Sequence, residues 1–596
     1  MSRLPVASFL TLIVASVGAF FITQHLKVTT PLIASPQISP QVINPLAGKT
    51  CAGTDHRQTT LSFSLLYRAD DVNVYVVDRS GEPVSTLATG RHVRKSQQVS
   101  FVWKGLQDNG SLAPDGIYHF RVALIHQGRT SELPTQSGAP RTVTLTTVVP
   151  HPVVDGVSPR LIPARDLKGA VIRYSGNENR GGTIVLYRTD LPGLPRRVKS
   201  FPTPWHGQIV VWDGRIHEQP APAGIYLVGL DVTDAACNTG HFPIVNPPPP
   251  GTTPHAGVTV RYLAAQPQLE PVAAGSRATV YVDSRQHLYN WTLTRAGARK
   301  PAIIARSDDY KLSVPVRASG AGLYAVALGY RSYRTAIPLV ASSPRPQRVL
   351  VVLPALTWQG LNPGDDDRDG LPDTLAAGFP VSLTRPLADG IPGDVAAEAA
   401  LLEYLDRFHR PYDLTTDVGL IEGVGPALAG HVAVVLAGSE RWAPSSLLSA
   451  LRTYVLGGGH VLSMGLDSLR SRVDLKGGVA MHPSAQAATD ALGAGFGPLA
   501  QNVGLITAEP SDGLGIFTST SGALTLAGAF EPITGVSPPG QIASRAVTSS
   551  GAAPIVGYRL GRGIVVDVAL KEFASSLARN VNAQEVLSRI WTVLSH

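Results

Sequence analysis

Short stretches in which apolar and polar residues alternate recur between residues 59 and 340, as in VNVYVVDR (72–79) and ATVYVDS (278–284). Alternation sends every second side chain to the same face, so each stretch predicts a β-strand with one buried face. Glycine and proline punctuate the stretches, as they do between the strands of antiparallel sandwiches. This part of the chain is therefore expected to form several β-sandwiches.

An internal repeat divides this region. WKGLQDNGSLAPDGIY (103–118) and WDGRIHEQPAPAGIY (212–226) share a W-x-G turn and an A-P-x-G-I-Y sequence that opens a strand. The pattern resembles the immunoglobulin-like (Ig-like) domain of flagellar hook-capping proteins, which implies a spacer or binding module rather than catalysis. Trp103 and Trp212 are expected to fill sandwich cores rather than to stack on a ligand.

The predicted sandwiches occupy residues 50–149, 150–248 and 255–344. The proline run NPPPPGTTP (246–254) is expected to be a stiff linker before the third sandwich.

The pattern changes after residue 345. Continuous apolar stretches such as QRVLVVLP (347–354) and HVAVVLAGS (431–439) alternate with helical ones such as DVAAEAALLEYLDRFH (394–409). Strands that are apolar on both faces are typical of parallel sheets covered by helices. Residues 345–596 are therefore predicted to be an α/β domain with a largely parallel, flavodoxin-like sheet.

Polar residues follow several of these predicted strands. Because open parallel sheets bind ligands outside the carboxyl ends of their strands, a ligand crevice is expected there. Each of these residues could also serve only as a helix cap or a turn residue. The predicted crevice consists of Trp358, Gln359, Asn362, Ser439, Glu440 and Asp467.

Three segments resemble the carboxy-terminal domain of the N,N-dimethylformamidase large (beta) subunit: VLVVLPALTWQGLN (349–362), LLEYLDRFHRPYDLTTDVGL (401–420) and the stretch that begins VVLAGSERW (434–442). The resemblance implies a fold similar to class I glutamine amidotransferases. It also implies a single iron, held by two tyrosines and a glutamate, that activates water to hydrolyse a small amide.

The chain departs from that family at both tyrosine positions. Leu361 and Arg441 stand where the resemblance places the tyrosines. A leucine has no donor atom and a guanidinium repels a metal, so iron is not expected. The cysteine nucleophile of glutamine amidotransferases is also missing, because no cysteine follows Cys237.

Two functions remain open for this domain. The first is binding or scaffolding at the bacterial cell envelope, without catalysis. The second is amide or ester hydrolysis with relocated metal ligands, for which Asp417, Glu440 and Asp467 are the candidates. Ser439 is a weaker candidate nucleophile, because AGSERW lacks the second glycine of G-x-S-x-G.

DDDRDGLPD (365–373) resembles the first part of a calcium loop. Ala376 stands where a full EF-hand loop carries a glutamate, so a shorter D-x-D-x-D-G-x-x-D clip is predicted. A solvated turn without an ion and a catalytic carboxylate pair are the alternatives. The predicted calcium ligands are Asp365, Asp367, Asp369, the Leu371 carbonyl and Asp373.

The amino terminus suggests a location. An uncharged apolar run from Leu4 to Ile22 follows Arg3 and is long enough to span a membrane. A single-pass anchor at 1–27, a stalk at 28–49 and an extracytoplasmic remainder are predicted; a cleaved signal, with secretion, is the alternative.

Charge and cysteine usage add two points. A net charge of +8 over 596 residues, without a dense Lys/Arg stripe, argues against nucleic acid as a partner. The membrane and a cell-envelope polymer or protein are the partners expected instead. Cys51 and Cys237 could form one disulfide, although the sequence does not show that they come within reach.

Overall fold

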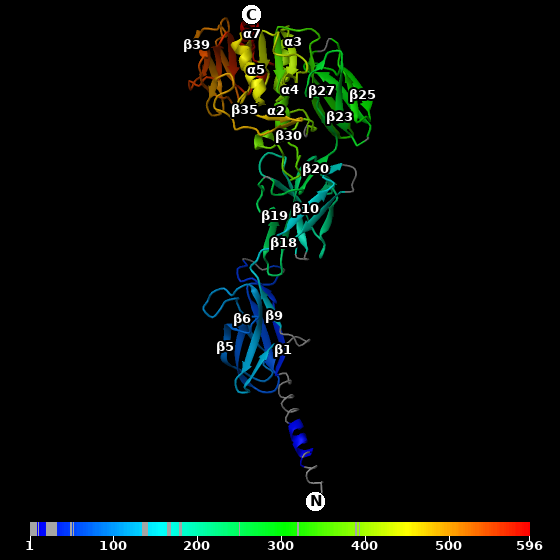
Figure 1. Ribbon diagram of the computed structural model, residues 1–596, viewed down its shortest axis with the longest axis vertical. Helices are drawn as coiled ribbons and strands as arrows, with labels where there is room; N and C mark the ends of the chain where they lie inside the picture. The colour runs from blue at the N-terminus through cyan, green and yellow to red at the C-terminus, as the bar shows by residue number, and fades with distance from the viewer. Residues whose placement is uncertain are drawn as a thin grey trace.

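The computed structural model describes residues 9, 11–19, 32–47, 51, 53–133, 141–163, 169–177, 181–249, 251–285, 287–318, 321–387, 390–392 and 394–596. The molecule is elongated: two sandwiches stand one above the other, and a broad head that carries the carboxy terminus lies at the far end (Figure 1). About 44% of the residues are in strands and 13% in helices.

Three sandwiches share one architecture, in which a three-stranded sheet faces a larger one. In the first, β1 (Ile33–Ser39), β3 (Thr59–Leu65) and β6 (Val99–Trp103) form the small sheet. The large sheet runs β2 (Val42–Ile43), β9 (Thr142–Leu145), β7 (Gly116–Leu124), β4 (Asp70–Val77), β5 (Pro83–Val93), with β8 (Arg129–Glu132) on β7.

The second sandwich repeats this order. Its small sheet is β10 (Val153–Ser158), β12 (Ala170–Ser175) and β15 (Ile209–Trp212). Its large sheet runs β11 (Leu161–Pro163), β20 (Gly257–Arg261), β18 (Gly224–Thr233), β13 (Gly182–Arg188), β14 (Arg196–Pro202), with β19 (Thr239–Phe242) on β18. The hairpin of β16 (Arg215–Ile216) and β17 (Gln219–Pro220) follows β15.

The third sandwich follows the same plan. Its sheets are β21 (Ala264–Gln266), β23 (Arg277–Asp283), β26 (Lys311–Pro315), and β22 (Val272–Ala273), β28 (Tyr333–Ser342), β27 (Gly322–Tyr330), β24 (Tyr289–Arg295), β25 (Ile303–Ser307).

The repeated sequence motif has a structural cause. Trp103 and Trp212 are each 1% exposed, and each indole N–H donates a hydrogen bond to a backbone carbonyl three residues later. Tyr118 and Tyr226 lie against these rings, at centroid distances of 4.9 and 5.5 Å, and their hydroxyls donate to the carbonyls of the motif prolines. The repeated pattern thus forms part of the core and the adjoining turn in each of the first two sandwiches.

The proline run lies inside the second sandwich. Strand β20, which follows the run, pairs with β18 and contributes Val258 and Val260 to the core of that sandwich. The run therefore connects β19 to β20, whereas the sequence suggests a linker between two sandwiches. The third sandwich begins with β21, directly after β20.

A nine-stranded mixed sheet forms the centre of the carboxy-terminal part. The order is β31 (Asp413–Thr416), β29 (Val349–Leu353), β32 (Ala433–Leu436), β34 (His460–Met464), β44 (Gly563–Val568), β43 (Ile555–Leu560), β42 (Gln541–Thr548), β39 (Gly504–Asp512), β40 (Ala523–Leu526). The pairings from β31 to β44 are parallel, and those from β44 to β40 are antiparallel.

This sheet contradicts the predicted largely parallel, flavodoxin-like or glutamine amidotransferase-like α/β fold. The continuous apolar stretches do form adjacent parallel strands, and β29 sends alternate side chains into two separate cores. The chain from 504 to 560 instead pairs antiparallel: β39 and β40 form one hairpin, β42 and β43 form another, and β42 pairs with β39. No helix lies between β39 and β43, so the chain has no helical crossover of the kind that parallel pairing uses. Local antiparallel pairing thus completes the sheet.

Helices cover this sheet sparsely. They are α2 (Ala355–Gly360), the 3₁₀ turn η1 (Leu375–Ala377), α3 (Val395–Arg407), α4 (Asp417–Glu422), α5 (Ser445–Leu456), α6 (Phe573–Ser576) and α7 (Val581–Ser595). Buried leucines of α3 and α7 belong to one core and those of α5 to the other. Short strands complete the loops: β30 (Val381–Ser382), β33 (Trp442–Ala443), β35 (Ser471–Arg472), β36 (Asp474–Lys476), β37 (Val479–Met481), β38 (Ala494–Phe496) and β41 (Ile533–Val536).

The third sandwich and the mixed sheet share a core. Leu269, Leu323 and Val340 of the sandwich pack in the same cluster as α3 and β29. Arg295 of β24 also forms an ion pair with Asp406 of α3 at 2.6 Å. These two parts make up the head of the molecule (Figure 1).

The amino-terminal segment does not support the predicted anchor. Residue 9 and residues 11–19 are helical, and residues 1–8, 10 and 20–31 lie outside the described residues. Within the described ranges, no helix is both long and apolar enough to cross a membrane, which contradicts the predicted single-pass anchor and membrane location.

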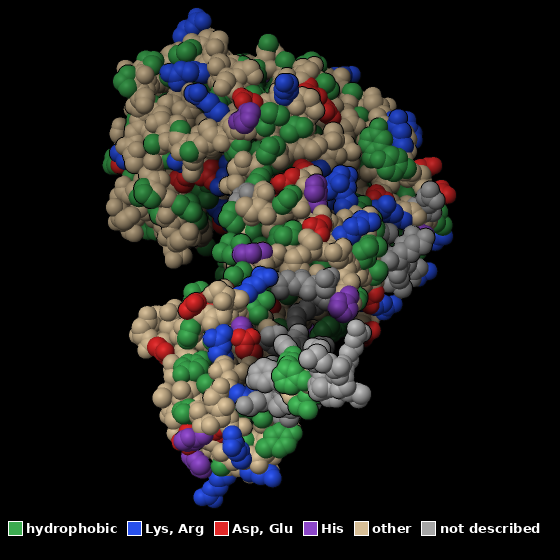
Figure 2. Space-filling view, turned by 60° about the horizontal axis from the view of Figure 1, so that its bottom comes forward, with side chains coloured by type: hydrophobic (Ala, Val, Ile, Leu, Met, Phe, Trp, Pro, Cys, Tyr) green, Lys and Arg blue, Asp and Glu red, His purple; other side chains and the backbone are tan. Residues whose placement is uncertain are grey.

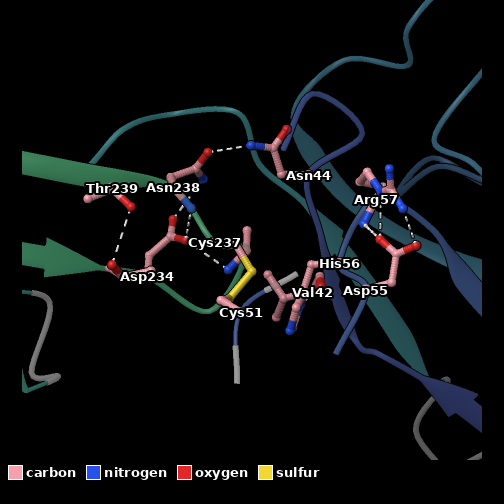
Figure 3. The surroundings of a disulfide bond; sticks show 12 residues. Val42, Asn44, Cys51, Asp55, His56, Arg57, Asp234, Cys237, Asn238 and Thr239 are labelled. Atoms are coloured by element: carbon pink, nitrogen blue, oxygen red, sulfur yellow. Dashed lines mark hydrogen bonds and ion pairs between the residues drawn. A yellow bond between two sulfur atoms is a disulfide. The ribbon is translucent and has the colours of Figure 1, made fainter. Parts of the chain in front are cut away.

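A disulfide joins the first two sandwiches (Figure 3). Cys51 lies in the loop before β3, Cys237 lies in the turn between β18 and β19, and the two are bonded with a Cα–Cα distance of 5.8 Å. A disulfide is typical of proteins from an oxidising compartment.

Surface charge marks no binding face in the view that Figure 2 gives. There, lysine and arginine side chains are interspersed with acidic ones rather than gathered in one patch.

Candidate functional site

Two adjoining cavities open at the carboxyl ends of β29, β32 and β34. Helix α2 starts directly after β29, and α3 covers the same edge. The cavities measure about 260 and 460 Å³. Thr357, Leu361, Asp394, Glu398 and Ser439 line both of them, so the two form one crevice.

The two ends of the crevice differ in character. The smaller cavity is mostly apolar, with walls of Trp358, Leu387 and Ile391. The larger one carries charged and amide side chains, among them Arg441, Asp467, Gln501, Lys571 and Glu572. The crevice is thus shaped for a ligand with one apolar and one polar end.

The two residues at the positions where the resemblance implies tyrosines come together here. Leu361 and Arg441 both line the larger cavity, although 80 positions separate them in the sequence. The Arg441 guanidinium forms an ion pair with Asp467 at 2.5 Å. An aliphatic chain and a paired cation offer no ligand to iron, so these residues do not fit the iron site that the resemblance implies.

Three carboxyls are buried beside the crevice, from α3, α4 and the loop after β32. Glu398, Asp417 and Glu440 are 1%, 0% and 2% exposed. Glu398 accepts hydrogen bonds from the Trp358 indole N–H at 3.1 and 3.2 Å, and Asp417 accepts from the amides of Leu356 and Val418. This set is called the carboxyl trio below.

Burial favours the protonated form of the trio. It raises the pKa of Glu398 to about 8 and that of Asp417 to about 7. Burial and then the charge of Asp417 raise the pKa of Glu440 well above its ordinary range. Among the described residues neither Glu440 oxygen has a hydrogen-bond donor, so a proton held between Glu440 and Asp417 would satisfy both carboxyls.

Ser439 lies at the floor of both cavities. Its Oγ accepts a hydrogen bond from the Leu466 amide at 3.2 Å, and within the described part of the chain it makes none with a histidine. Without an adjacent base a serine hydroxyl is a weak nucleophile.

Gln359 and Asn362 form hydrogen bonds that hold α2 and the chain just after it to a neighbouring loop. The Gln359 amide donates to the carbonyls of Leu383 and Arg385, and Asn362 donates to Gln359 Oε1 at 2.9 Å. Gln359 is fully buried, whereas Asn362 also borders the smaller cavity. Of the predicted crevice residues, Trp358, Asn362, Ser439 and Asp467 line a cavity, and Gln359 and Glu440 lie behind it.

Sequence reasoning missed Glu398. It lies one helical turn after Val395, on the buried stripe that continues with Leu401, Leu402 and Leu405. A charged residue on the apolar face of a helix is a signal of a special environment, and this pattern could have identified it.

The aspartate loop lies away from the crevice. Oxygens of Asp365, Asp367 and Asp373 come within 4.8 Å of one another. Burial and then the neighbouring Asp369 charge raise the pKa of Asp365 to about 7, and burial raises that of Asp373 to about 6. Asp365 Oδ1 is buried without a donor among the described residues, so the donor set fits a hard cation such as calcium.

The aspartate loop also docks on the second sandwich. The amide of Gly257 donates to the Arg368 carbonyl at 2.9 Å, and the hydroxyls of Thr253 and Thr189 donate to the carbonyls of Asp369 and Gly370. A Cβ on Gly257 would lie 2.3 Å from Asp365 Oδ2, so glycine is needed for this approach. The loop therefore forms the joint between that sandwich and the head.

Two known families match separate parts of this chain. Residues 48–128 match the FlgD Ig-like domain, and residues 306–484 match the family described as N,N-dimethylformamidase beta subunit-like, C-terminal. The second match begins within the third sandwich and includes both cavity-lining segments that contain Leu361 and Arg441. No curated protein sequence matches the chain.

Solved structures are similar to this chain only in part. An exo-β-1,4-mannosidase from Opitutaceae bacterium strain TAV5 is 14% identical over 42% of this chain and 36% of its own, with a TM-score of 0.24. A β-galactosidase from Bacillus circulans sp. alkalophilus is 12% identical over 40% and 31%, with a TM-score of 0.22. The ligand-binding domain of human OSCAR is 12% identical over 35% and 97%, with a TM-score of 0.19. The chain spans about a third of the length of the two glycosidase chains.

Proposed function

We propose that this protein binds a small ligand in the crevice of its head and acts without iron chemistry, as a binding or scaffolding protein. The observation that carries the proposal is the meeting of Leu361 and Arg441 in one cavity, where the family resemblance places two metal-binding tyrosines. The head has a crevice at this place, but neither residue can bind iron. A crevice without iron ligands supports ligand binding rather than iron-dependent hydrolysis.

The dimensions of the crevice support this proposal. Its cavities of about 260 and 460 Å³ together fall in the range of roughly 300–1,000 Å³ that is usual for small-molecule sites. Trp358 and Ile391 offer apolar contact, and Arg441 with Asp467 offers a polar end. A small amphipathic molecule with a polar head is the class of ligand that these walls favour.

Hydrolysis is the second candidate, because Asp417 and Glu440 do come together. A carboxyl pair that shares a proton can act as general acid and base. Asp467, the third residue considered for relocated metal binding, instead pairs with Arg441. Glu440 also lies behind the cavity walls, which favours a role in shaping the site over contact with a substrate.

A thermal-shift screen with two tryptophan variants tests the proposal. The panel consists of small amides, carboxylates, amines and esters. Leu361→Trp fills the region shared by both cavities, and Leu505→Trp changes an exposed leucine of β39 and is the matched control. We expect at least one compound to stabilise the wild type and Leu505→Trp but not Leu361→Trp. Turnover of an amide or ester that Leu361→Trp abolishes would favour hydrolysis instead.

We also propose that the aspartate loop binds one calcium ion with Asp365, Asp367 and Asp373, and that the ion stiffens the joint between the second sandwich and the head. The convergent oxygens, the unpartnered Asp365 Oδ1 and the contacts of the loop with β20 support this. Asp369, which the sequence suggests as a ligand, stabilises the loop instead, because its carboxylate accepts a hydrogen bond from the Leu371 amide. The disulfide supports a location in an oxidising compartment, where calcium is abundant enough to fill weak sites.

A further inference from the structure

A histidine accompanies the disulfide at the joint between the first two sandwiches (Figure 3). Both sulfurs and one imidazole nitrogen of His56 lie within 4.8 Å of one another. All three side chains are half-buried, so a small reagent or an ion can reach them. This cluster is separate from the crevice and from the aspartate loop.

A backbone contact fixes the tautomer of His56. Its Nδ1 lies 2.8 Å from the carbonyl oxygen of Val42. Because a carbonyl oxygen only accepts, Nδ1 carries the proton and Nε2 keeps its lone pair. A ring that donates one N–H to a backbone carbonyl is the usual arrangement of a metal-binding histidine.

The turn that carries Cys237 is held against the first sandwich by contacts other than the disulfide. The turn of Cys237 is fixed by Asp234, whose carboxylate accepts from the amide and the side chain of Asn238, both at 2.8 Å. Asn238 also donates to the Thr146 carbonyl of the first sandwich at 3.2 Å and accepts from Asn44 at 2.5 Å. Because these bonds cross the joint, the two thiols are expected to stay close after reduction.

We propose that reduction of the Cys51–Cys237 disulfide creates a Cys₂His site for a zinc-class divalent ion, which then bridges the two sandwiches. A thiol or phosphine reductant supplies two electrons to the S–S bond, and two protons complete the thiols while the reductant is oxidised. The ion displaces both thiol protons and binds two thiolates and the imidazole, which leaves a fourth position for water.

The donor set selects the ion. Thiolate and imidazole ligands favour zinc and similar ions, whereas calcium takes oxygen ligands. The site would therefore not compete with the aspartate loop for calcium. A metal bridge would preserve the joint under conditions that break the covalent one.

Cobalt titration of the full chain tests this inference. The protein is reduced with a water-soluble phosphine, freed of reductant without oxygen and titrated with Co²⁺ in excess Ca²⁺, which fills the aspartate loop. We expect a thiolate-to-cobalt charge-transfer band that saturates at one equivalent per chain and disappears when Zn²⁺ is added. The oxidised chain is expected to show no such band.

Two histidine variants show whether the imidazole is a ligand. His56→Ala is expected to weaken Co²⁺ binding at least about tenfold, since even outer partners of a metal site typically contribute 10–100-fold. His241→Ala, which removes an exposed histidine paired with Asp231 in the second sandwich, is the control and should bind as the wild type does. A reduced chain without the band, or equal affinity in His56→Ala and the wild type, would overturn the inference. Unfolding of the first two sandwiches on reduction would also overturn it.

Discussion

The aspartate loop and the carboxyl trio are both clusters of carboxyl groups, but the negative charge of each is expected to be neutralised in a different way. In the loop, Asp365, Asp367 and Asp373 turn oxygens towards one point, and part of the cluster is exposed to solvent. In the trio, Glu398, Asp417 and Glu440 are sealed from solvent. The trio, within the described residues, does not bring three oxygens as close together.

This difference shows why similar residues lead to different proposals. Convergent, reachable oxygens suit a hard cation, which neutralises them while they remain ionised. Sealed carboxyls are neutralised by protons, because desolvation penalises their charged form. The loop is therefore proposed to bind an ion, whereas the trio is expected to be neutral, with Glu398 in the cavity wall and Asp417 and Glu440 behind it.

The pH dependence of stability should show the largest effect. The pKa of Glu398 rises from 4.5 to about 8 and that of Asp417 from 3.8 to about 7, so in the folded state both carboxyls hold protons that the unfolded chain releases. Their stabilisation is full below pH 4 and is lost as the pH rises towards 8. Between pH 5 and 7 each carboxyl should lower the unfolding free energy by about 1.4 kcal/mol per pH unit.

A single variant isolates Glu398 from the other titrating groups. Glu398→Gln keeps the shape of the side chain and removes its titratable proton, so the decline measured by urea unfolding at pH 5, 6 and 7 should flatten by about 1.4 kcal/mol per pH unit. Equal slopes in the variant and the wild type would show that Glu398 is not protonated in the folded state.

Removal of calcium should have the next largest effect. Calcium at a hundred times its Kd stabilises a folded protein by about 2.7 kcal/mol, and a chelator should remove this contribution. The effect should vanish as the pH falls below 6, because Asp365 and Asp373 take up protons with pKa values of about 7 and 6. Thermal unfolding with calcium and with chelator, at pH 5.5 and 7.5, measures this; equal midpoints at pH 7.5 would count against the ion.

A single methyl group should weaken the loop's docking by a smaller amount. Gly257→Ala places a Cβ 2.3 Å from Asp365 Oδ2, and such overpacking costs about 1–3 kcal/mol. The control is Gly535→Ala in β41, where a Cβ meets nothing within 4 Å. Calorimetric titration should show weaker calcium binding in Gly257→Ala alone, and equal affinity in both variants would separate the loop from the joint.

Sequence patterns predicted local features better than assembly. The W-x-G and A-P-x-G-I-Y motifs identified core residues, because Trp103 and Trp212 satisfy their own hydrogen bonds nearby. The mixed sheet could not be foreseen from four apolar strands, because its antiparallel half depends on the pairing of β42 with β39, two strands that are not neighbours in the sequence. The proline run likewise looked like a linker, because its pairing strand β20 lies beyond it.

The residue types at positions 361 and 441 can be read from the sequence, but their proximity cannot. The structure places Leu361 and Arg441 in one cavity, although 80 positions separate them. The roles of Gln359 and Glu440 were not predictable, because burial behind the wall depends on how α2 and α4 pack. The contact of the aspartate loop with Gly257 is between residues more than 100 positions apart and leaves no local pattern.

Metal analysis of the purified, oxidised protein tests whether the aspartate loop holds calcium and whether the head lacks iron. Wild type prepared without chelators is compared with Asp365→Asn/Asp367→Asn, which removes two of the proposed ligands. We expect about one calcium per chain in the wild type, none in the variant, and neither iron nor zinc in stoichiometric amount. Stoichiometric iron or zinc that survives in the variant would contradict the proposal that this protein acts without a catalytic metal.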